Sequence, residues 1–262
     1  MKYGFIGCGN MGGALARALS KTTKDIMLAD FDSKKAQSLA DELGVKCGTN
    51  NDIVLGCERI FLGVKPQVMG EMLGSVKDIL KEKKPLLISM AAGLSTEKIC
   101  EMVSEQIPVI RIMPNTPVSV GKGMILYCAN MLVSKQSILD FVSDMRFGGI
   151  LDELPEELMD AGCSVSGCGP AFMYMFIDAL ARGGEECGLP REKAIKYAAA
   201  TMAGAAELAL TSGKTPEELR NAVCSPGGST LEGVKVLTEE NITEIGIKTV
   251  KASFKRNIEL GK

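Results

Sequence analysis

Short apolar runs alternate with stretches of helical periodicity over the first part of the chain. A strand is predicted over 3–6, and the apolar residues over 11–19 recur at helical spacing. Further strands are predicted over 25–29, 59–64, 85–90 and 109–113, with helices over 34–43, 67–80 and 96–104. This alternation is typical of an α/β fold with a mainly parallel, doubly wound sheet. Segments 124–128 and the region near Gly149 are expected to add edge strands.

The pattern changes after about residue 152, and no strand is predicted from Pro155 onward. Helices are predicted over 170–187, 191–210, 216–223, 230–237 and 243–260, separated by Gly and Pro clusters. Several of them are apolar around most of their circumference, which favours burial between subunits. We therefore expect two domains, an α/β domain over 1–151 and an all-helical domain over 152–262.

Composition excludes several classes of function. The 262 residues carry a net charge of −2 without a long run of one sign, so a nucleic-acid partner is not expected. The chain has no histidine, which excludes imidazole bases and ligands. The nine cysteines form no Cys-x-x-Cys pair, so we expect reduced thiols and neither disulfides nor a metal site.

The chain is expected to be cytoplasmic. No apolar run reaches the roughly 18 residues that would span a bilayer. The first residues are too short and too glycine-rich for a signal peptide and are predicted to form a strand directly. We therefore expect no membrane partner.

A glycine-rich loop follows the first strand. The segment Gly7, Cys8, Gly9, Asn10, Met11, Gly12 fits the G-x-G-x-x-G pattern. In that pattern the first glycine permits a tight turn, the second lets backbone approach a pyrophosphate, and the third lets helix and strand pack closely. The N-terminus of the following helix favours the phosphate charge. This context predicts a Rossmann-type NAD(P)-binding domain.

The end of the second predicted strand bears on the choice between NAD and NADP. Asp30 stands where an acid binds the ribose 2′-hydroxyl, and Asp32 adds negative charge. Lys34 and Lys35 follow at once and could hold a 2′-phosphate, although they also suit a solvated first helical turn. The choice between NADPH and NADH stays open at this point.

Five further segments carry a family resemblance. Val-Lys-Pro-Gln at 64–67, Ser-Met-Ala-Ala-Gly at 89–93 and Arg-Ile-Met-Pro-Asn-Thr-Pro at 111–117 follow predicted parallel strands, where ligands of such sheets bind. Ser-Gly-Cys-Gly-Pro-Ala at 166–171 and Ser-Pro-Gly-Gly-Ser-Thr at 225–230 complete the set. With these motifs the chain closely resembles the pyrroline-5-carboxylate reductase family over essentially its whole length.

The resemblance implies an NAD(P)H-dependent reduction of 1-pyrroline-5-carboxylate to L-proline, the last step of proline biosynthesis. It also implies a helical domain that binds substrate and forms an interlocked homodimer, with dimers often assembling into decamers. By position, it implies cofactor contacts from Gly7, Cys8, Gly9, Asn10, Met11, Gly12, Asn50, Gly63, Val64, Lys65, Pro66, Ala91, Ala92, Gly93 and Asn115, the last near the nicotinamide. It implies substrate contacts from Glu156, Val223, Gly227, Gly228, Ser229 and Thr230.

Two positions depart from the family pattern. Cys168 replaces the usual second serine of Ser-Gly-Ser-Gly-Pro, which puts one hydroxyl contact in doubt. Asp30 stands where the family often has Ser or Asn, which puts an NADPH preference in doubt. From the residues alone, Glu156 and Glu157 are also interpreted as an acidic pair that complements a helix N-terminus.

The Gly-Gly-Ser-Thr turn also suits a carboxylate site on physical grounds. The two glycines permit a tight turn, Ser229 or Thr230 is expected to cap the next helix, and the exposed N–H groups can bind an anion. A simple helix connection is the alternative. A protonated imine needs positioning more than a strong acid, and we hypothesise that Thr230 holds the ring N–H and relays a proton through water.

Two other functions are compatible with the fold. Another imine or ketone reductase of the 6-phosphogluconate-dehydrogenase-like group would share this build. A β-hydroxyacid dehydrogenase, however, needs a lysine after the second glycine segment, and no lysine occurs between Gly167 and Pro190. A non-catalytic nucleotide-sensing protein would keep the glycine loop and lose the carboxylate site, whereas the 226–230 segment is intact here.

Overall fold

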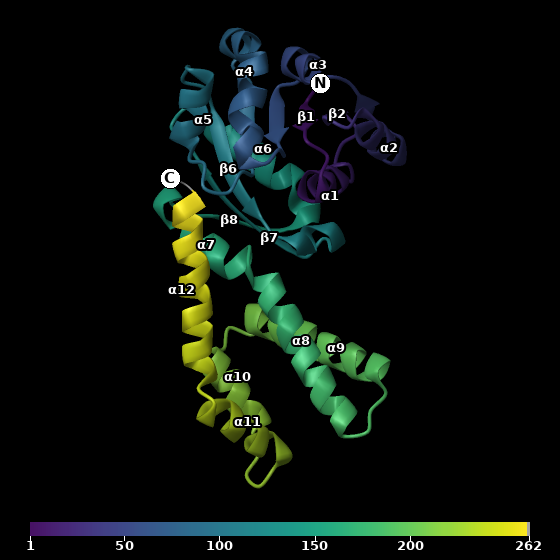
Figure 1. Ribbon diagram of the computed structural model, residues 1–262, viewed down its shortest axis with the longest axis vertical. Helices are drawn as coiled ribbons and strands as arrows, with labels where there is room; N and C mark the ends of the chain where they lie inside the picture. Colours follow the sequence, from purple (N-terminus) through teal and green to yellow (C-terminus); the bar gives the residue numbers. More distant parts are fainter. Residues whose placement is uncertain (261–262) are drawn as a thin grey trace. The chain divides into compact units, whose positions relative to one another are not determined.

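The computed structural model of the protein describes residues 1–260. The chain divides into two compact units (Figure 1). The first consists of Met1–Cys168 together with the chain from Ser253 onward, and the second of Gly169–Ala252. The first unit therefore reaches past residue 151 and includes the C-terminal part of the helix that begins at Ile242.

The first unit is built on an eight-stranded sheet of order β3-β2-β1-β4-β5-β6-β7-β8. All neighbouring strands are parallel except β6 and β7, which pair antiparallel. The strands are β1 (Tyr3–Ile6), β2 (Ile26–Ala29), β3 (Lys46–Cys47), β4 (Arg59–Leu62), β5 (Leu86–Ser89), β6 (Val109–Pro114), β7 (Gly123–Ala129) and β8 (Gly149–Glu153). The expected edge position of segment 124–128 is wrong, because β8 pairs with the outer side of β7.

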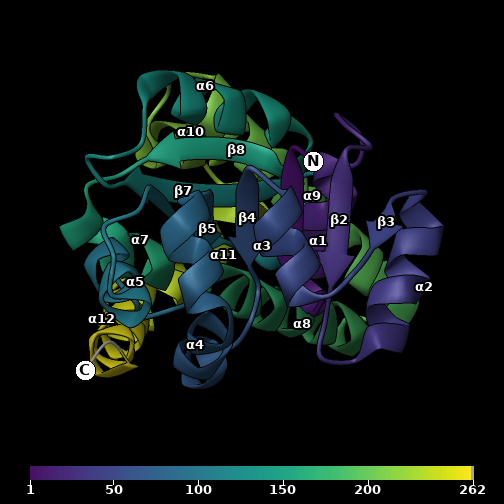
Figure 2. The ribbon, with the colours of Figure 1, turned by 90° about the horizontal axis from the view of Figure 1, so that it is seen from above.

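Helices cover both faces of the sheet (Figure 2). Residues of α1 (Asn10–Leu19), α2 (Ser33–Leu43) and α6 (Lys135–Asp144) share one buried cluster with the strands, together with Val118 of the 3-10 turn η1 (Thr116–Val120). Residues of α3 (Asn50–Gly56), α4 (Pro66–Lys83) and α5 (Thr96–Val103) share a second cluster. The two separate clusters confirm the doubly wound α/β architecture.

Strand register brings the loops that follow β1, β2 and β4 to one edge of the sheet. Ile6 of β1 is the register partner of both Ala29 of β2 and Leu62 of β4. The residues that follow continue the pairing, since the Gly7 N–H donates to Ala29 O and the Gly63 N–H donates to Ile6 O, each at 2.8 Å. Ligands of open parallel sheets bind at such strand ends, where the order reverses about β1.

The second unit contains helices and no strand within the part of the chain described. Its helices are α8 (Gly169–Glu186), α9 (Arg191–Thr211), α10 (Pro216–Val223), α11 (Ser229–Glu239) and the first part of α12 (Ile242–Leu260). The helix α7 (Met159–Ser166) and the 3-10 turns η2 (Arg146–Gly148) and η3 (Glu156–Leu158) belong to the first unit.

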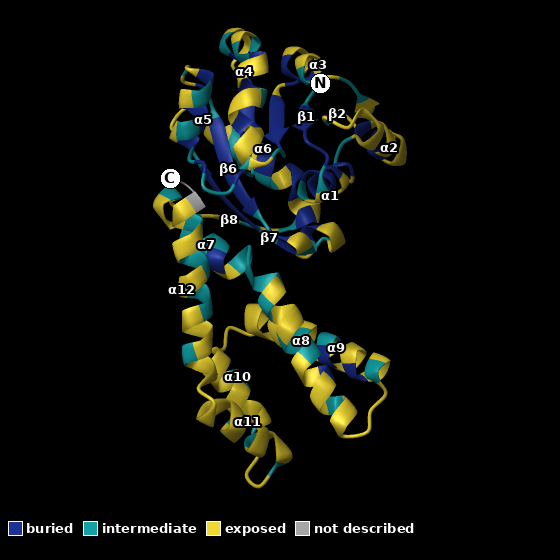
Figure 3. Cartoon of the chain, viewed as in Figure 1, coloured by how far each residue is buried: buried dark blue, intermediate teal, exposed yellow. Residues whose placement is uncertain are grey.

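The second unit lacks a core of its own. Its buried hydrophobic side chains, among residues 169–252, are Ala181, Ala194 and Ala198, whereas large apolar side chains such as Met175 and Leu210 are 74% and 68% exposed (Figure 3). Many large exposed apolar side chains on one set of helices are typical of an interaction site. The predicted helices are therefore present, and much of their apolar surface stays exposed within residues 1–260.

Helix length and mean hydropathy single out one segment of the described residues as a candidate membrane span. Within residues 1–260, the helical stretch Glu156–Glu186 is long and apolar enough to cross a membrane by length and composition alone. One such stretch is weak evidence for a membrane, because exposed apolar helices also form subunit interfaces.

Candidate functional site

The glycine loop between β1 and α1 has the backbone that its pattern predicts. Gly7 adopts a φ of +101°, which side chains rarely tolerate, and a Cβ there would lie 2.6 Å from the carbonyl carbon of Gly63. A Cβ on Gly12 would run into the carbonyl oxygen of Gly7. The first and third glycines thus permit the close approach of three backbone segments.

Gly9 has a different role from its two neighbours. A Cβ at this position would meet no atom within 4 Å, so the space above the loop is open. Gly9 is also the N-cap residue of α1, and no side chain caps the N–H groups of the first turn. Uncapped N–H groups beside an open cradle provide what a pyrophosphate needs. The residues present therefore fit a bound dinucleotide.

Asp30 ties the end of β2 to this loop. Its Oδ2 accepts a hydrogen bond from the Cys8 N–H at 2.6 Å, and its Oδ1 accepts one from the Asp32 N–H at 3.0 Å. Asp32 is the N-cap of α2, where its carboxylate accepts from the N–H groups of Lys34 and Lys35. Both lysine side chains are exposed. The acidic turn thus lies beside the glycine loop.

Cys8 lies within the loop as a buried thiol. Burial raises its pKa to about 12, and the nearby carboxylate of Asp30 acts in the same direction. Its Sγ lies 3.5 Å from the carbonyl oxygen of Ala29. A thiol that stays protonated is a poor nucleophile, so the contribution of Cys8 to the site comes from its backbone.

The other predicted cofactor residues lie after β3, β4 and β5. Asn50 opens α3, behind a capping box formed by Thr49 and Asp52. Gly63–Pro66 leads from β4 into α4, with Lys65 as its N-cap and Pro66 in the first turn. Ala91–Gly93 follows β5 as a turn in which Gly93 has a φ of +76°. The parallel register places all three segments at the same sheet edge as the glycine loop.

Asn115 is 9% exposed and its side chain is engaged at both ends. Its Nδ2 donates to the carbonyl oxygen of Ser166 at 3.0 Å, and its Oδ1 accepts from the Met124 N–H at 2.9 Å. The residue therefore joins the end of β6 to β7 and to the end of α7. This is a positioning role that the sequence alone does not reveal.

Glu156 binds the N-terminus of a helix far from it in sequence. Its Oε1 accepts the Thr96 N–H and its Oε2 accepts the Thr96 hydroxyl, each at 2.7 Å, so its carboxylate complements α5. The interpretation of Glu156 as a helix-terminal acid is thus correct in kind, although the helix is α5 and not the following α7. A contact with substrate would come in addition to these bonds.

Sequence reasoning missed the partners of Glu156. Arg111 of β6 is 4% exposed, with Nη2 2.7 Å from Asp160 Oδ1 and Nη1 3.8 Å from Glu156 Oε1, while its buried Nε has no partner within residues 1–260. Asn257 of α12 donates to the Asp160 carbonyl oxygen and to Ser164 Oγ. A charge inside an apolar strand is the signal that could have pointed to this cluster.

The predicted substrate segment lies in the second unit, between α10 and α11. Gly227 has a φ of +74°, which a glycine adopts without strain, and Val223 ends α10 with 65% of its surface exposed. Gly228 is the N-cap of α11, whose first turn no side chain caps. The expected capping by Ser229 or Thr230 is therefore wrong, because both residues already lie inside the first turn and only Gly228 has the extended backbone of a cap.

The start of α11 can still bind an anion. The N–H groups at the start of α11 have no side-chain cap, and Ser229 and Thr230 are exposed. An uncapped helix N-terminus with free hydroxyls can bind a carboxylate.

The nine cysteines are all free thiols. No group of three or more Cys, Asp or Glu side chains within residues 1–260 could hold a metal ion.

Comparisons with known proteins agree with this arrangement. Residues 2–93 match a family model described as NADP oxidoreductase, coenzyme F420-dependent, and residues 156–260 match one described as pyrroline-5-carboxylate reductase dimerisation. A pyrroline-5-carboxylate reductase of Synechocystis sp. is 36% identical over 267 residues, which cover 100% of this chain and 99% of that protein.

Solved structures give the same result. A pyrroline-5-carboxylate reductase from Coxiella burnetii matches with a TM-score of 0.93 and 33% identity, over 100% of this chain and 98% of that one. The pyrroline carboxylate reductase of Plasmodium falciparum, solved with NADP bound, matches with a TM-score of 0.87 and 30% identity over the same shares.

The dimerisation model covers the helices whose apolar surfaces are exposed, which accounts for those surfaces as an oligomer interface. It also covers the whole of the apolar stretch Glu156–Glu186. A Rossmann-type cradle that fits NAD(P)H precedes these helices in the same chain. With relatives that match over its whole length, the chain belongs to the pyrroline-5-carboxylate reductase family.

Proposed function

We propose that this protein reduces 1-pyrroline-5-carboxylate to L-proline, with NAD(P)H as the hydride donor, as the last step of proline biosynthesis. The reaction consumes the imine, one NAD(P)H and one proton, and yields proline and NAD(P)⁺. The observation that carries the proposal is the open cradle at Gly9 beside the uncapped start of α1, in a chain of this family.

The cofactor residues of the proposal all follow strands of the first unit. The backbone of the loop from Gly7 to Gly12 would hold the pyrophosphate, and Asp30 would lie at the adenosine ribose. Segments 63–66 and 91–93, together with Asn50, would complete the walls, and Asn115 would stand near the nicotinamide. Bound there, the nicotinamide supplies a hydride.

The substrate residues of the proposal centre on the turn before α11. The N–H groups of Gly228, Ser229 and Thr230 would bind the carboxylate of the cyclic imine, with Gly227 shaping the turn and Val223 contacting the ring. Glu156 would add a polar contact beyond its bonds to Thr96. We propose the functional division 1–151 for cofactor binding and 152–262 for substrate binding and dimerisation.

Thr230 is the proposed catalytic residue. Its hydroxyl would accept a hydrogen bond from the ring N–H of the protonated imine and relay a proton through water. Orientation of the ring can lower the barrier by roughly 7–11 kcal/mol. Thr230→Ala should lower kcat/KM by roughly a hundredfold, the low end for a positioned proton-transfer group. Thr230→Ser, which keeps the hydroxyl, should restore most of the activity. Wild-type kcat/KM in Thr230→Ala would refute this assignment.

We further propose a cytoplasmic homodimer that can assemble into a decamer, with no nucleic-acid or membrane partner. The near-neutral net charge supports the absence of a nucleic-acid partner. The exposed apolar helices support the oligomer. Light scattering on the purified chain would give the number of subunits. Fractionation of cells would show the compartment in which the protein lies.

The experiment that tests the function is a substrate-dependent assay. Purified protein is mixed with NADH or NADPH and 1-pyrroline-5-carboxylate, and reduced-nicotinamide absorbance and L-proline are followed together. We expect the amount of reduced nicotinamide that is lost to equal the amount of L-proline that is formed. Turnover of ketones with none of the imine would favour another reductase of similar build, and cofactor binding without any turnover would favour a nucleotide-sensing protein.

A further inference from the structure

The turn between β2 and α2 carries two fixed negative charges next to the glycine loop. Asp30 is held in place by two backbone donors, the N–H groups of Cys8 and Asp32, at 2.6 and 3.0 Å. Asp32 is held by the N–H groups of Lys34 and Lys35, at 3.1 and 3.4 Å. Because backbone groups fix both carboxylates, neither can turn away from an approaching ligand without losing its bonds.

These bonds also occupy the donors that a 2′-phosphate would use. In dinucleotide-binding folds the ribose 2′ position lies at the end of the second strand, where an acid accepts its hydroxyl. A 2′-phosphate there would draw on the N-terminal N–H groups of the next helix. In this chain the N–H groups of Lys34 and Lys35 already donate to Asp32, so a dianion would meet two carboxylates in place of free donors.

Between the two acids stands an aromatic side chain that the described residues 1–260 leave fully exposed. Phe31 is fully exposed, at 108% of its reference area, although solvent exposure of a phenyl ring loses hydrophobic stabilisation. It directly follows the residue that would accept the ribose hydroxyl. A flat apolar face at this place suits the adenine ring, whose stacking on an aromatic ring is favourable.

We propose that the turn Asp30–Phe31–Asp32 makes this protein an NADH-preferring member of its family. Asp30 accepts the 2′-hydroxyl of the adenosine ribose and, with Asp32, repels a 2′-phosphate, while Phe31 stacks on adenine in either cofactor. The inference rests on the proposed function and adds the choice of cofactor to it.

Lys34 and Lys35 are the strongest argument for the opposite preference. Their ammonium groups balance the two carboxylates in formal charge. However, both side chains are exposed and lie on flexible stems, where water and salt screen them. The carboxylates are fixed at the ribose position by backbone hydrogen bonds, so we expect their charge to determine which cofactor is preferred.

Equilibrium binding tests the preference without any reliance on turnover. The affinities of the full-length protein for NAD⁺ and NADP⁺ are measured by calorimetry at low salt. We expect NAD⁺ to bind at least roughly tenfold more tightly, given two like charges near the phosphate. Equal affinities, or tighter binding of NADP⁺, would overturn the proposal.

Two variants separate the parts of the turn. Asp30→Asn keeps an oxygen that can accept the Cys8 N–H but removes one charge, so NADP⁺ affinity should rise roughly tenfold while the melting temperature stays close to wild type. Phe31→Ala should weaken both cofactors by a similar factor and leave their ratio unchanged. Met131, which is also fully exposed but lies after β7, provides the control: Met131→Ala should change neither affinity.

Failure of the cofactor preference and failure of the proposed function give different results. If Asp30→Asn leaves NADP⁺ affinity unchanged while replacement of Lys34 and Lys35 by alanine abolishes it, the lysines select the cofactor and the proposal fails. Reduction of 1-pyrroline-5-carboxylate with a preference for NADPH would support the function and refute the inference. Tighter NAD⁺ binding without imine reduction would support the inference and refute the proposed function.

Discussion

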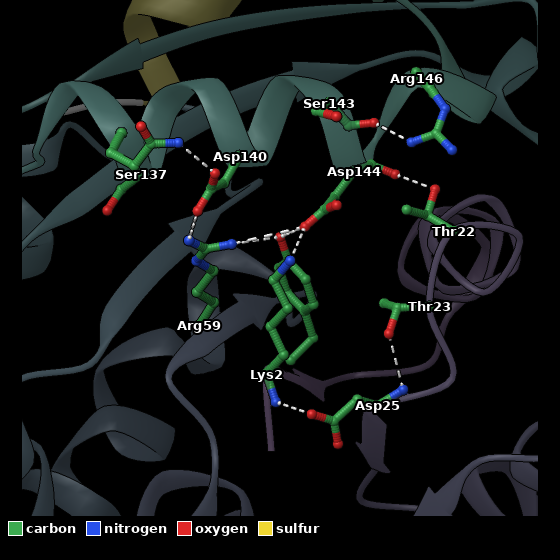
Figure 4. A network of polar contacts seen from close by, with 12 residues as sticks. Lys2, Thr22, Thr23, Asp25, Arg59, Ser137, Asp140, Ser143, Asp144 and Arg146 are labelled. Atoms are coloured by element: carbon green, nitrogen blue, oxygen red, sulfur yellow. Dashed lines mark hydrogen bonds and ion pairs between the residues drawn. The ribbon is translucent and has the colours of Figure 1, made fainter.

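The buried phenol of Tyr3 donates a hydrogen bond to Asp144 Oδ2 at 2.7 Å, across 141 positions of sequence. The same carboxylate oxygen lies 2.6 Å from Lys2 Nζ and 3.7 Å from Arg59 Nη1 (Figure 4). Arg59 in turn donates to Asp140 at 2.6 Å. The network therefore joins the first residues of β1 and β4 to α6, at the strand ends opposite the glycine loop.

Loss of Asp144 should destabilise the protein. Asp144→Ala leaves Arg59 and the Tyr3 hydroxyl buried with fewer partners, and we expect the free energy of unfolding to fall by about 3 kcal/mol. Tyr3→Phe removes one hydrogen bond and keeps the ring, so a loss of about 1 kcal/mol is expected. Urea unfolding followed by circular dichroism measures both.

The Arg17–Glu42 pair provides the matched control. It joins α1 to α2 at 2.7 Å, but both side chains are about half exposed. Exposed pairs contribute little, so Glu42→Ala should have a much smaller effect than Asp144→Ala. Similar effects of the two changes would show that the Asp144 network does not hold α6 to the sheet.

Two glycines of the same loop should respond to alanine in opposite ways. Gly9→Ala adds a methyl group that meets no protein atom, so the fold should be retained while the new group fills the cradle and dinucleotide binding is lost. Gly12→Ala places its methyl group against the Gly7 carbonyl and should cost about 3 kcal/mol of stability. Thermal melting and calorimetric titration with NAD⁺ separate the two effects. Undiminished binding by folded Gly9→Ala would contradict the assignment of the cradle.

Buried thiols should resist alkylation at pH 8. Burial raises the pKa of Cys8 and Cys128 to about 12 and that of Cys57 to about 11. The raised pKa keeps these thiols protonated, and the thiolate fraction should grow about tenfold for each pH unit between 8 and 10. Mass spectrometry after brief iodoacetamide treatment should find exposed Cys187 modified first.

Unfolding in guanidinium is the control for the thiol experiment, since all nine cysteines should then react. Rapid alkylation of Cys8 in the native protein at pH 8 would mean that the loop opens to solvent.

The apolar helices of the second unit should hold the chain in an oligomer at micromolar concentration. Met175→Glu puts a charge on α8, within the residues that match the dimerisation model, and should shift the protein toward smaller species with a lower melting temperature. Met131→Glu is an equally drastic change outside that region and should leave the mass unchanged. A folded wild-type monomer in light scattering would contradict the interface.

Local patterns predicted most of the fold. The helix over 11–19 and the strand over 3–6 agree with α1 and β1 within a residue, because their apolar spacing is regular. The strand β3 has only two residues, too few to show a period, and α3 rests on a capping box formed by Thr49 and Asp52 more than on periodicity.

The cofactor loops could be recognised because glycine patterns are local, whereas the supporting contacts are not. Arg111 and Asp160 are 49 residues apart, and Asn115 reaches Ser166 across 51. Nothing in a short window of sequence specifies such pairs. The capping of α11 was mispredicted because Ser and Thr are common caps, while here Gly228 takes the extended conformation one residue earlier.

Isotope transfer tests the central claim most directly. The protein is incubated with 1-pyrroline-5-carboxylate and NADH or NADPH carrying deuterium at both C4 positions of the nicotinamide, and L-proline is analysed by mass spectrometry. Direct hydride transfer predicts proline heavier by about one mass unit, with the label on the carbon that had been doubly bonded to nitrogen. Unlabelled proline, or none with either cofactor, would contradict the account.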